Sequence, residues 1–199
     1  DQGIAPMSRE MKQEIADQLA TKSITATPLV LGLDGLSIFV KGTNPVPSLD
    51  LPTLVKIFTC EITTWNQIPG SGLNGAIKAY RRNDASGTTD AFKHFTGVKN
   101  FGACVTVVNE TADIADVTSR DGLALGYSGL SGKTNDNRPV AIAARAGSPA
   151  VLPTTATVRD FSYPMARKLY VYVVSGAAAP NEAEQNFLTY ISDRSFMDP

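Results

Sequence analysis

Apolar and polar positions alternate along this chain with two periods, one typical of strands and one typical of helices. The apolar run 36–40 predicts a strand, and the turn-forming residues 42–45 end it. In residues 51–58 the apolar positions recur at the i, i+3, i+4, i+7 spacing of a helix with one buried face. Asp50 precedes this run as a suitable N-cap. The pattern therefore predicts a strand followed by a buried helix.

The same alternation continues to the end of the chain, with a Gly- and Asn-rich loop at 129–138 and a connector at 149–157. An apolar segment lies at 29–33, and further β-rich runs are expected at 76–80, 105–108, 124–127, 139–144 and 168–174. Further helices are expected at 89–95 and 112–119. Strands that alternate with helices in this way predict a layered α/β fold.

The two terminal helices are expected to pack through apolar faces. Ser8 can cap the first, and Asn181 with Glu184 makes a capping pair for the last. The apolar faces expected to pack are Met11, Ile15 and Leu19 in the first helix, and Phe187, Leu188 and Ile191 in the last.

The length, charge and composition of the chain disfavour several classes of function. The chain has 199 residues with 18 basic and 19 acidic side chains, enough for one domain or two small lobes. A net charge of −1 makes binding to a nucleic-acid backbone a poor hypothesis. No apolar run approaches the roughly 18 residues that span a bilayer. A start at Asp1-Gln2-Gly3, without an initiator Met, predicts that any targeting segment has been removed.

Cysteine and histidine are too few for a zinc site. Cys60, Cys104 and His94 are the whole supply, and His94 is expected in the middle of a helix, on the surface or in packing rather than in catalysis. The two cysteines are either a disulfide or two separate buried thiols. For a closed loop of about 45 residues, chain entropy gives a stabilisation of about 4 kcal/mol.

The most informative segment lies between a predicted strand and a predicted helix. Ser86, Gly87 and Thr88 occupy the start of that helix, where free backbone N–H groups and the helix dipole favour an anion. Arg82 adds a planar fork that suits an oxyanion. No Lys follows Gly87, so the segment is not a nucleotide-binding Walker loop. The alternative is an ordinary capped helix with surface arginines. Ser8-Arg9 is expected at a second helix start, which favours an anion held between two elements.

An ordered set of segments resembles the periplasmic phosphate-binding proteins of ABC-type phosphate uptake systems, over nearly the whole chain. The segments are Asp34-Gly35-Leu36, 54–58, 61–65, the Arg82-x-Asp84-x-Ser86-Gly87-Thr88 motif, Gly126-Tyr127 and 163–170. The resemblance implies a type II periplasmic-binding-protein fold, with 1–42 plus 139–199 as the first lobe and 43–138 as the second. The ligand-binding positions that it implies are Ser8 and Arg9 in the first lobe, with Arg82, Ser86, Gly87 and Thr88 in the second.

Two departures from the family pattern bear on the site. Arg9 stands where relatives often have Asp, whose carboxylate accepts a proton from phosphate, so Asp84 is the remaining candidate acceptor; the resemblance also pairs Asp84 with Arg82. Members of the family carry about fifty residues before the segment matching Asp1, and a first lobe without them would leave an unpaired sheet edge and an exposed apolar face. We therefore expect another chain or an upstream region to complete an incomplete first lobe.

These observations favour a periplasmic or extracellular solute receptor that binds phosphate or a similar tetrahedral oxyanion without turnover and without a cofactor. Its expected partners include the membrane subunits of an ABC transporter. The alternative is a structural or protein-interaction module that kept the fold and lost tight anion binding. A phosphoester hydrolase is a third hypothesis, which the missing metal cluster and the position of His94 disfavour.

Overall fold

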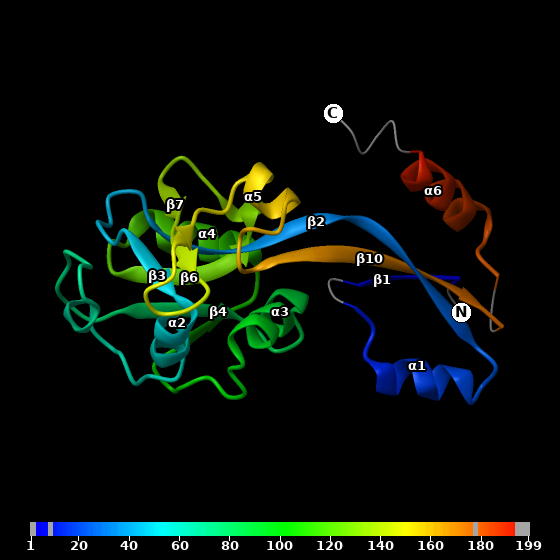
Figure 1. Ribbon diagram of the computed structural model, residues 1–199, viewed down its shortest axis with the longest axis horizontal. Helices are drawn as coiled ribbons and strands as arrows, with labels where there is room; N and C mark the ends of the chain where they lie inside the picture. Colours follow the sequence, from blue (N-terminus) through cyan, green and yellow to red (C-terminus); the bar gives the residue numbers. More distant parts are fainter. Residues whose placement is uncertain (1–2, 8–9, 177–178, 194–199) are drawn as a thin grey trace. The chain divides into compact units, whose positions relative to one another are not determined.

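The structure, a computed structural model, describes residues 3–7, 10–176 and 179–193. The chain divides into two compact units. Unit 1 is residues 1–33 with 168–199, and unit 2 is residues 34–167 (Figure 1). The lobes expected from the sequence, 1–42 plus 139–199 and 43–138, have other boundaries than these units, and they stay a prediction. Residues 139–167 belong to unit 2 because their strands pair with strands of that unit.

Unit 2 is built on a mixed sheet. The second half of β2 (Thr25–Lys41) pairs antiparallel with β6 (Ala124–Gly129) and with β7 (Asn137–Pro139). On the other side of β6, β4 (Lys78–Arg82) and then β5 (Thr106–Val108) follow in parallel pairing. The carboxyl ends of the parallel strands β4 and β5 therefore lie at the same edge of the sheet.

Helices and a second, small sheet complete unit 2. Its helices are α2 (Leu51–Phe58), α3 (Gly87–Thr96), α4 (Thr111–Arg120), α5 (Thr155–Arg159), and the 3-10 helices η1 (Trp65–Gln67) and η2 (Leu130–Gly132). The second sheet has the strand order β3 (Ser48–Asp50), β8 (Ala141–Ala143) and β9 (Ala150–Val151). The predicted α/β class is confirmed.

A continuous aromatic core fills unit 2. Trp65, Phe58, Phe92 and Tyr127 are all fully buried. The rings of Phe92 and Tyr127 stack with their centroids 4.3 Å apart, and Phe58 packs at 4.6 Å from Phe92. Such aromatic pairs add to the stabilisation that burial of apolar surface already gives.

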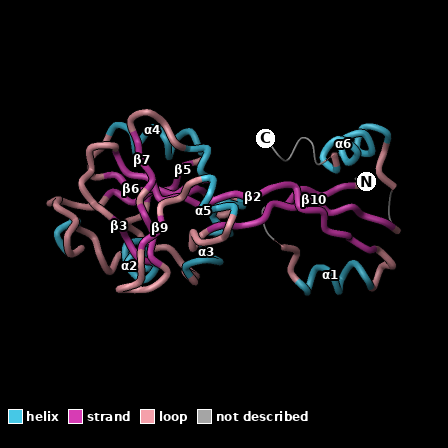
Figure 2. Tube along the Cα trace, turned by 45° about the horizontal axis from the view of Figure 1, so that its top comes forward, coloured by secondary structure: helices cyan, strands magenta, loops and turns pink. Residues whose placement is uncertain are grey.

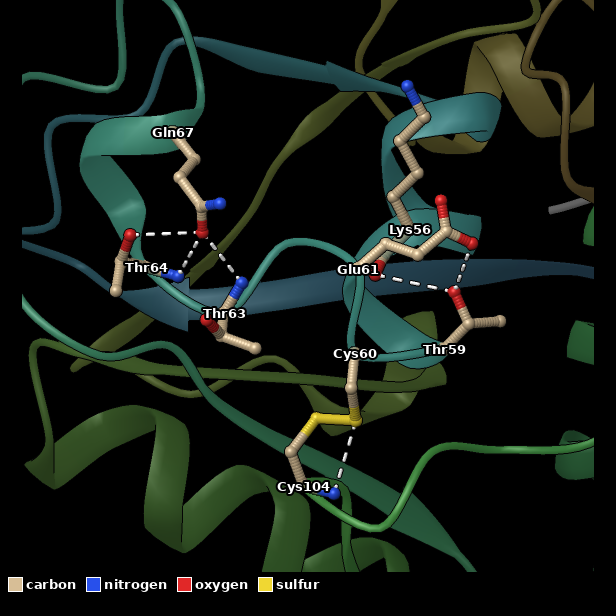
Figure 3. Close-up of a disulfide and its surroundings, with 8 residues drawn as sticks. All are labelled: Lys56, Thr59, Cys60, Glu61, Thr63, Thr64, Gln67 and Cys104. Carbon is tan, nitrogen blue, oxygen red and sulfur yellow. Dashed lines mark hydrogen bonds between the residues drawn. A yellow bond between two sulfur atoms is a disulfide. The ribbon is translucent and has the colours of Figure 1, made fainter.

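A disulfide closes part of this unit. Cys60, just after α2, is bonded to Cys104, so the alternative of two separate thiols is ruled out (Figure 3). The backbone N–H of Cys104 also donates to Cys60 Sγ. On the neighbouring turn, Gln67 Oε1 accepts hydrogen bonds from the backbone N–H groups of Thr63 and Thr64 (Figure 3). These contacts fix the loops that follow α2.

Unit 1 has far less interior. Its strand β1 (Ile4–Met7) pairs antiparallel with β10 (Ala166–Ser175), and its helices are α1 (Gln13–Ala20) and α6 (Glu182–Ser192). The strands β2 and β10 carry the chain between the units (Figure 2). No residue of α1 is buried, and Ile191 is the one buried residue of α6.

Two expectations for this part of the chain are wrong. The first helix begins at Gln13, with Lys12 as its N-cap, and not after Ser8. Phe187 is 39% exposed, whereas Ile191 of the same helix is buried, so the apolar face of α6 is only partly covered. The apolar segment 29–33 and the strand expected at 36–40 form one long strand, β2.

Candidate anion-binding site at the start of helix α3

The candidate site lies at the carboxyl ends of two neighbouring parallel strands. Helix α3 begins five residues after β4 ends, and α4 begins three residues after β5 ends. Both helices therefore begin at the same edge of the sheet. The N-terminus of a helix offers unpaired backbone N–H groups and the positive end of the helix dipole. This edge of unit 2 therefore favours an anion.

Ser86 holds the first turn of α3. It is the N-cap of the helix, with extended backbone angles, and its Oγ accepts a hydrogen bond from the Thr88 N–H at 3.2 Å. Its own N–H donates to the carbonyl of Asn83 at 3.2 Å, which closes the turn between strand and helix. Gly87 and Thr88 are half-buried. The structure brings Ser86, Gly87 and Thr88 together in one turn.

Arg82 is the last residue of β4, and its side chain lies against the start of α4. Nη1 donates to Thr111 Oγ1 at 2.8 Å, and Nη2 lies 3.8 Å from Glu110 Oε2. The side chain is only 15% exposed. Within the described part of the chain, Arg82 Nε is the one buried side-chain nitrogen or oxygen that lacks a hydrogen-bond partner. A charged N–H without an acceptor is costly, so this atom is an unfilled position for an acceptor.

The main chain of Arg82 is tied into the core. Its carbonyl oxygen accepts hydrogen bonds from Thr89 Oγ1 at 3.0 Å and from Arg81 Nη1 at 3.1 Å. Thr89 Oγ1 is also 2.8 Å from the hydroxyl of Tyr127. Burial raises the pKa of Tyr127 to about 12, so the hydroxyl stays protonated at neutral pH. The end of β4 and the first turn of α3 are thereby joined through a buried hydroxyl network.

Asp84 does not pair with Arg82, so that expectation is wrong. Its carboxylate accepts from Lys93 Nζ at 2.9 Å and from Arg81 Nη2 at 3.1 Å, and it is 62% exposed. The hydrogen bonds from Lys93 and Arg81 lower the pKa of Asp84. Arg81 and Lys93 flank Asp84 in sequence, whereas Arg82 is directed toward Glu110. Asp84 is therefore already engaged by two cations.

The two predicted ligands of the first lobe, Ser8 and Arg9, lie outside the described residues. The segment just after them is attached to β10. The N–H of Met11 donates to the hydroxyl of Tyr172 at 2.8 Å, and the hydroxyl of Tyr170 is 3.4 Å from Glu10 Oε1. Because α1 begins only at Gln13, the idea of a second helix start at Ser8 loses its basis.

Sequence reasoning missed an ion pair beside the first turn of α3. Arg167 donates from Nη2 and Nε to Asp34 Oδ2, at 2.7 and 3.0 Å. Its Nη1 donates to the carbonyl of Gly87 at 3.2 Å. A signal was available, because Asp34 interrupts an apolar strand and a charge in such a strand needs a partner. Its partner is distant in sequence, so the strand pattern alone does not name it.

The described residues contain no group of His, Cys, Asp and Glu that would hold a metal ion. In the same residues, no helix has both the length and the apolar character to cross a bilayer. The donors that the site offers are amide N–H groups, hydroxyls and guanidinium groups, which suit an oxyanion.

Comparison with known proteins places the chain in a family. The profile of the PBP superfamily domain matches residues 3–194. The chain belongs to the PBP superfamily. Its fold is the type II periplasmic-binding-protein fold, in agreement with the expectation from sequence. A solved structure of an ABC-type phosphate transport receptor from Vibrio cholerae superposes with a TM-score of 0.77, at 22% identity, over 98% of this chain and 75% of that one.

Two curated PBP relatives are similar in sequence. Phosphate-binding protein PstS from Pseudomonas aeruginosa is 28% identical over 207 residues, which cover 96% of this chain and 64% of the relative. Protein SphX from Synechococcus elongatus is 30% identical over 183 residues, which cover 88% of this chain and 54% of the relative. The chain thus spans less than two thirds of the length of either relative.

Proposed function

We propose that this chain is a non-catalytic receptor for phosphate or a similar tetrahedral oxyanion, and that it delivers the anion to an ABC-type uptake system. The observation that carries the proposal is the buried, unpartnered Nε of Arg82, close in sequence to the first turn of α3. A charge-assisted hydrogen bond from an anion oxygen would satisfy that atom. Ser86 Oγ–H and the N–H of Gly87 add donors that none of the described hydrogen bonds uses.

The names of the relatives support phosphate as the anion to test first. The Pseudomonas aeruginosa relative is a phosphate-binding protein, and the Vibrio cholerae structure is a phosphate transport receptor. On this proposal the chain acts outside the cytoplasmic membrane, in the periplasm or extracellularly. Its partners are the anion and the membrane subunits of the transporter.

A further partner is suggested by the apolar side chains that are exposed in unit 1. Val30, Leu33, Phe187 and Tyr190 are each more than a third exposed. We propose that another chain, or further residues of a longer chain, covers them and completes the first lobe. Light scattering with urea unfolding tests this idea, and a cooperatively folded monomer of the 199-residue chain would count against it.

Isothermal titration calorimetry tests the receptor proposal, with phosphate, sulfate and molybdate as titrants. We expect saturable heat with phosphate. Arg82→Ala should weaken binding roughly 10- to 100-fold, the range for a lost charge-assisted hydrogen bond. Arg145→Ala is the matched control, because Arg145 is exposed on a loop before β9, and it should leave the affinity unchanged.

The outcomes separate the two candidate functions. The engagement of Arg82 by Thr111 and Glu110 is the observation that favours the alternative, an interaction module with weak or lost anion binding. Silence for all three anions would support that module and reject the receptor. Equal binding by the Arg82→Ala and Arg145→Ala variants would show that the anion binds elsewhere.

A further inference from the structure

We propose that Arg167 is a positioning residue for anion binding: held by Asp34, it fixes the first peptide group of α3, whose N–H donates to Ser86 Oγ, and so it places the Ser86 hydroxyl for the anion. This inference rests on the proposed function, whose site it deepens. It assigns a role in binding to two residues that do not themselves belong to the predicted ligand set.

The guanidinium of Arg167 binds the carboxylate of Asp34 through one edge and the carbonyl of Gly87 through its remaining nitrogen. Nε and Nη2 both donate to Asp34 Oδ2, and the remaining nitrogen, Nη1, donates to the Gly87 carbonyl oxygen at 3.2 Å. The group is planar and rigid, so the carboxylate that binds one edge also sets the direction of Nη1. The side chains of Arg167 and Asp34 are only 11% and 19% exposed. Salt and water therefore screen this arrangement weakly.

Asp34 itself is held close to the neighbouring strand. A Cβ atom at Gly129, the last residue of β6, would lie 3.3 Å from Asp34 Oδ1 and 3.5 Å from Oδ2. A side chain at position 129 would therefore crowd the carboxylate. The absence of one lets Asp34 sit against the end of β6 with its Oδ2 directed at Arg167.

The carbonyl that Arg167 contacts belongs to the same peptide group as the Thr88 N–H. Because the peptide group is planar, fixing the Gly87 oxygen also fixes the direction of that N–H. A carbonyl oxygen has two lone pairs, so it can accept from Arg167 as well as from the helix. A donor on the oxygen also polarises the N–H of the same group and strengthens it as a donor. The Thr88 N–H donates to Ser86 Oγ at 3.2 Å, so Arg167 acts through this peptide group on the Ser86 hydroxyl, a predicted anion donor, without touching the anion.

The two residues of the ion pair also lie at the two positions where the chain passes from one unit to the other. Asp34 is the first residue of unit 2 on β2, and Arg167 is its last residue on β10. The pair therefore joins the two connecting strands where they leave unit 2. Its third contact, on Gly87, attaches the first turn of α3 to those strands.

A buried ion pair with a purely structural role is the competing explanation, and a second arginine of unit 2 provides the matched control. Arg138 Nη2 donates to the carbonyl oxygens of Asn44, at 2.7 Å, and of Val46. Like Arg167 it is partly buried and holds backbone carbonyls, but those carbonyls lie between β2 and β3 and not at α3. Arg167→Gln and Arg138→Gln each remove a guanidinium from a backbone carbonyl.

The experiment combines calorimetric titration with inorganic phosphate and the ¹H–¹⁵N spectrum of the free chain. Arg167→Gln should weaken phosphate binding about tenfold or more and should shift the Thr88 amide signal before any phosphate is added. Arg138→Gln should change the affinity less than about twofold and leave the Thr88 signal in place. Arg167→Lys keeps the positive charge but not the planar guanidinium. Its phosphate affinity should therefore lie between those of Arg167→Gln and the wild-type chain, and its Thr88 amide signal should stay shifted from the wild-type position.

The results distinguish this inference from the function on which it rests. If the wild-type chain binds no phosphate, the proposed function fails, and the role of Arg167 in binding fails with it. If the wild-type chain binds and Arg167→Gln binds equally well, only the positioning role is overturned. Equal losses in the Arg167→Gln and Arg138→Gln variants, or full recovery in Arg167→Lys, would also overturn it. Where Arg167→Gln does not fold, the affinity and the Thr88 signal of Arg167→Lys decide between the two explanations.

Discussion

The two units of the chain carry similar local signals but differ in what those signals bury. In unit 2, Trp65, Phe92 and Tyr127 are fully buried in one aromatic core. Among the described residues of unit 1, the buried apolar side chains are Val171, Tyr172 and Ile191. A short stretch of chain encloses a smaller fraction of its apolar surface than a long one. The comparison indicates that local sequence signals decide where helices and strands form, whereas packing between distant residues decides how much apolar surface each unit buries.

The largest expected difference between the units concerns one aromatic side chain in each. Phe92→Ala removes a fully buried ring and should lower the free energy of unfolding by about 3–5 kcal/mol. Phe187→Ala removes a ring that is 39% exposed and should cost less than about 1 kcal/mol. Urea unfolding followed by circular dichroism measures both. Equal costs would show that unit 1 has a core comparable to that of unit 2.

The disulfide is the next largest effect, and it is confined to unit 2. The Cys60–Cys104 bond closes a loop with a sequence separation of 44, so replacing both cysteines by Ser should cost about 2–4 kcal/mol. Trp65, the chain's single tryptophan, reports unfolding of unit 2 by its fluorescence. Amide exchange in α6 should stay unchanged. Faster exchange there would show that the units unfold as one.

What the sequence predicts well are features encoded within a few residues. Asp50 is expected to cap α2, and its Oδ1 accepts from the Thr53 N–H at 2.7 Å. Ser86 is expected at the start of α3, and it is the N-cap. These contacts join positions two or three residues apart, so the residue types alone are enough to indicate them.

What the sequence does not predict depends on residues that are distant along the chain. Periodicity marks Phe187 as part of an apolar face, but it does not say whether another element covers that face. The expected partner of Arg82 is Asp84 and the observed one is Glu110, since the direction of a strand end decides which helix start it meets. Arg167 reaches Asp34 across 133 positions, and only the pairing of strands brings the two together.

An intermediate effect is expected at alkaline pH, where buried tyrosines differ from exposed ones. Burial raises the pKa of Tyr127 to about 12, from about 10 in the unfolded chain. A pKa that is higher in the folded state gives stability that is complete below pH ~10 and is lost as the pH rises to ~12. In the Tyr127→Phe variant, the free energy of unfolding should therefore fall by about 2 kcal/mol less over this pH range than in the wild-type chain.

The control for this measurement is Tyr170 in unit 1. Burial, and then the negative charge of Glu10, raise the pKa of Tyr170, but the residue is only partly enclosed. Tyr170→Phe should therefore alter the alkaline loss of stability less than Tyr127→Phe does. Urea unfolding at intervals between pH 9 and pH 12 measures both variants. The idea that burial separates the units would be contradicted by a larger change in Tyr170→Phe.

The smallest effect tests the part of the comparison in which the units should agree. Asp50 caps α2 in unit 2, and Asn181 caps α6 in unit 1 by accepting from the Glu184 N–H at 2.9 Å. Because a cap acts on its own first turn, Asp50→Ala and Asn181→Ala should each cost about 1 kcal/mol, independently of the core beneath. Amide exchange in the first turns of α2 and α6 measures the two costs separately. A negligible cost at Asn181 would mean that α6 is held by other contacts, and that local signals as well as packing differ between the units.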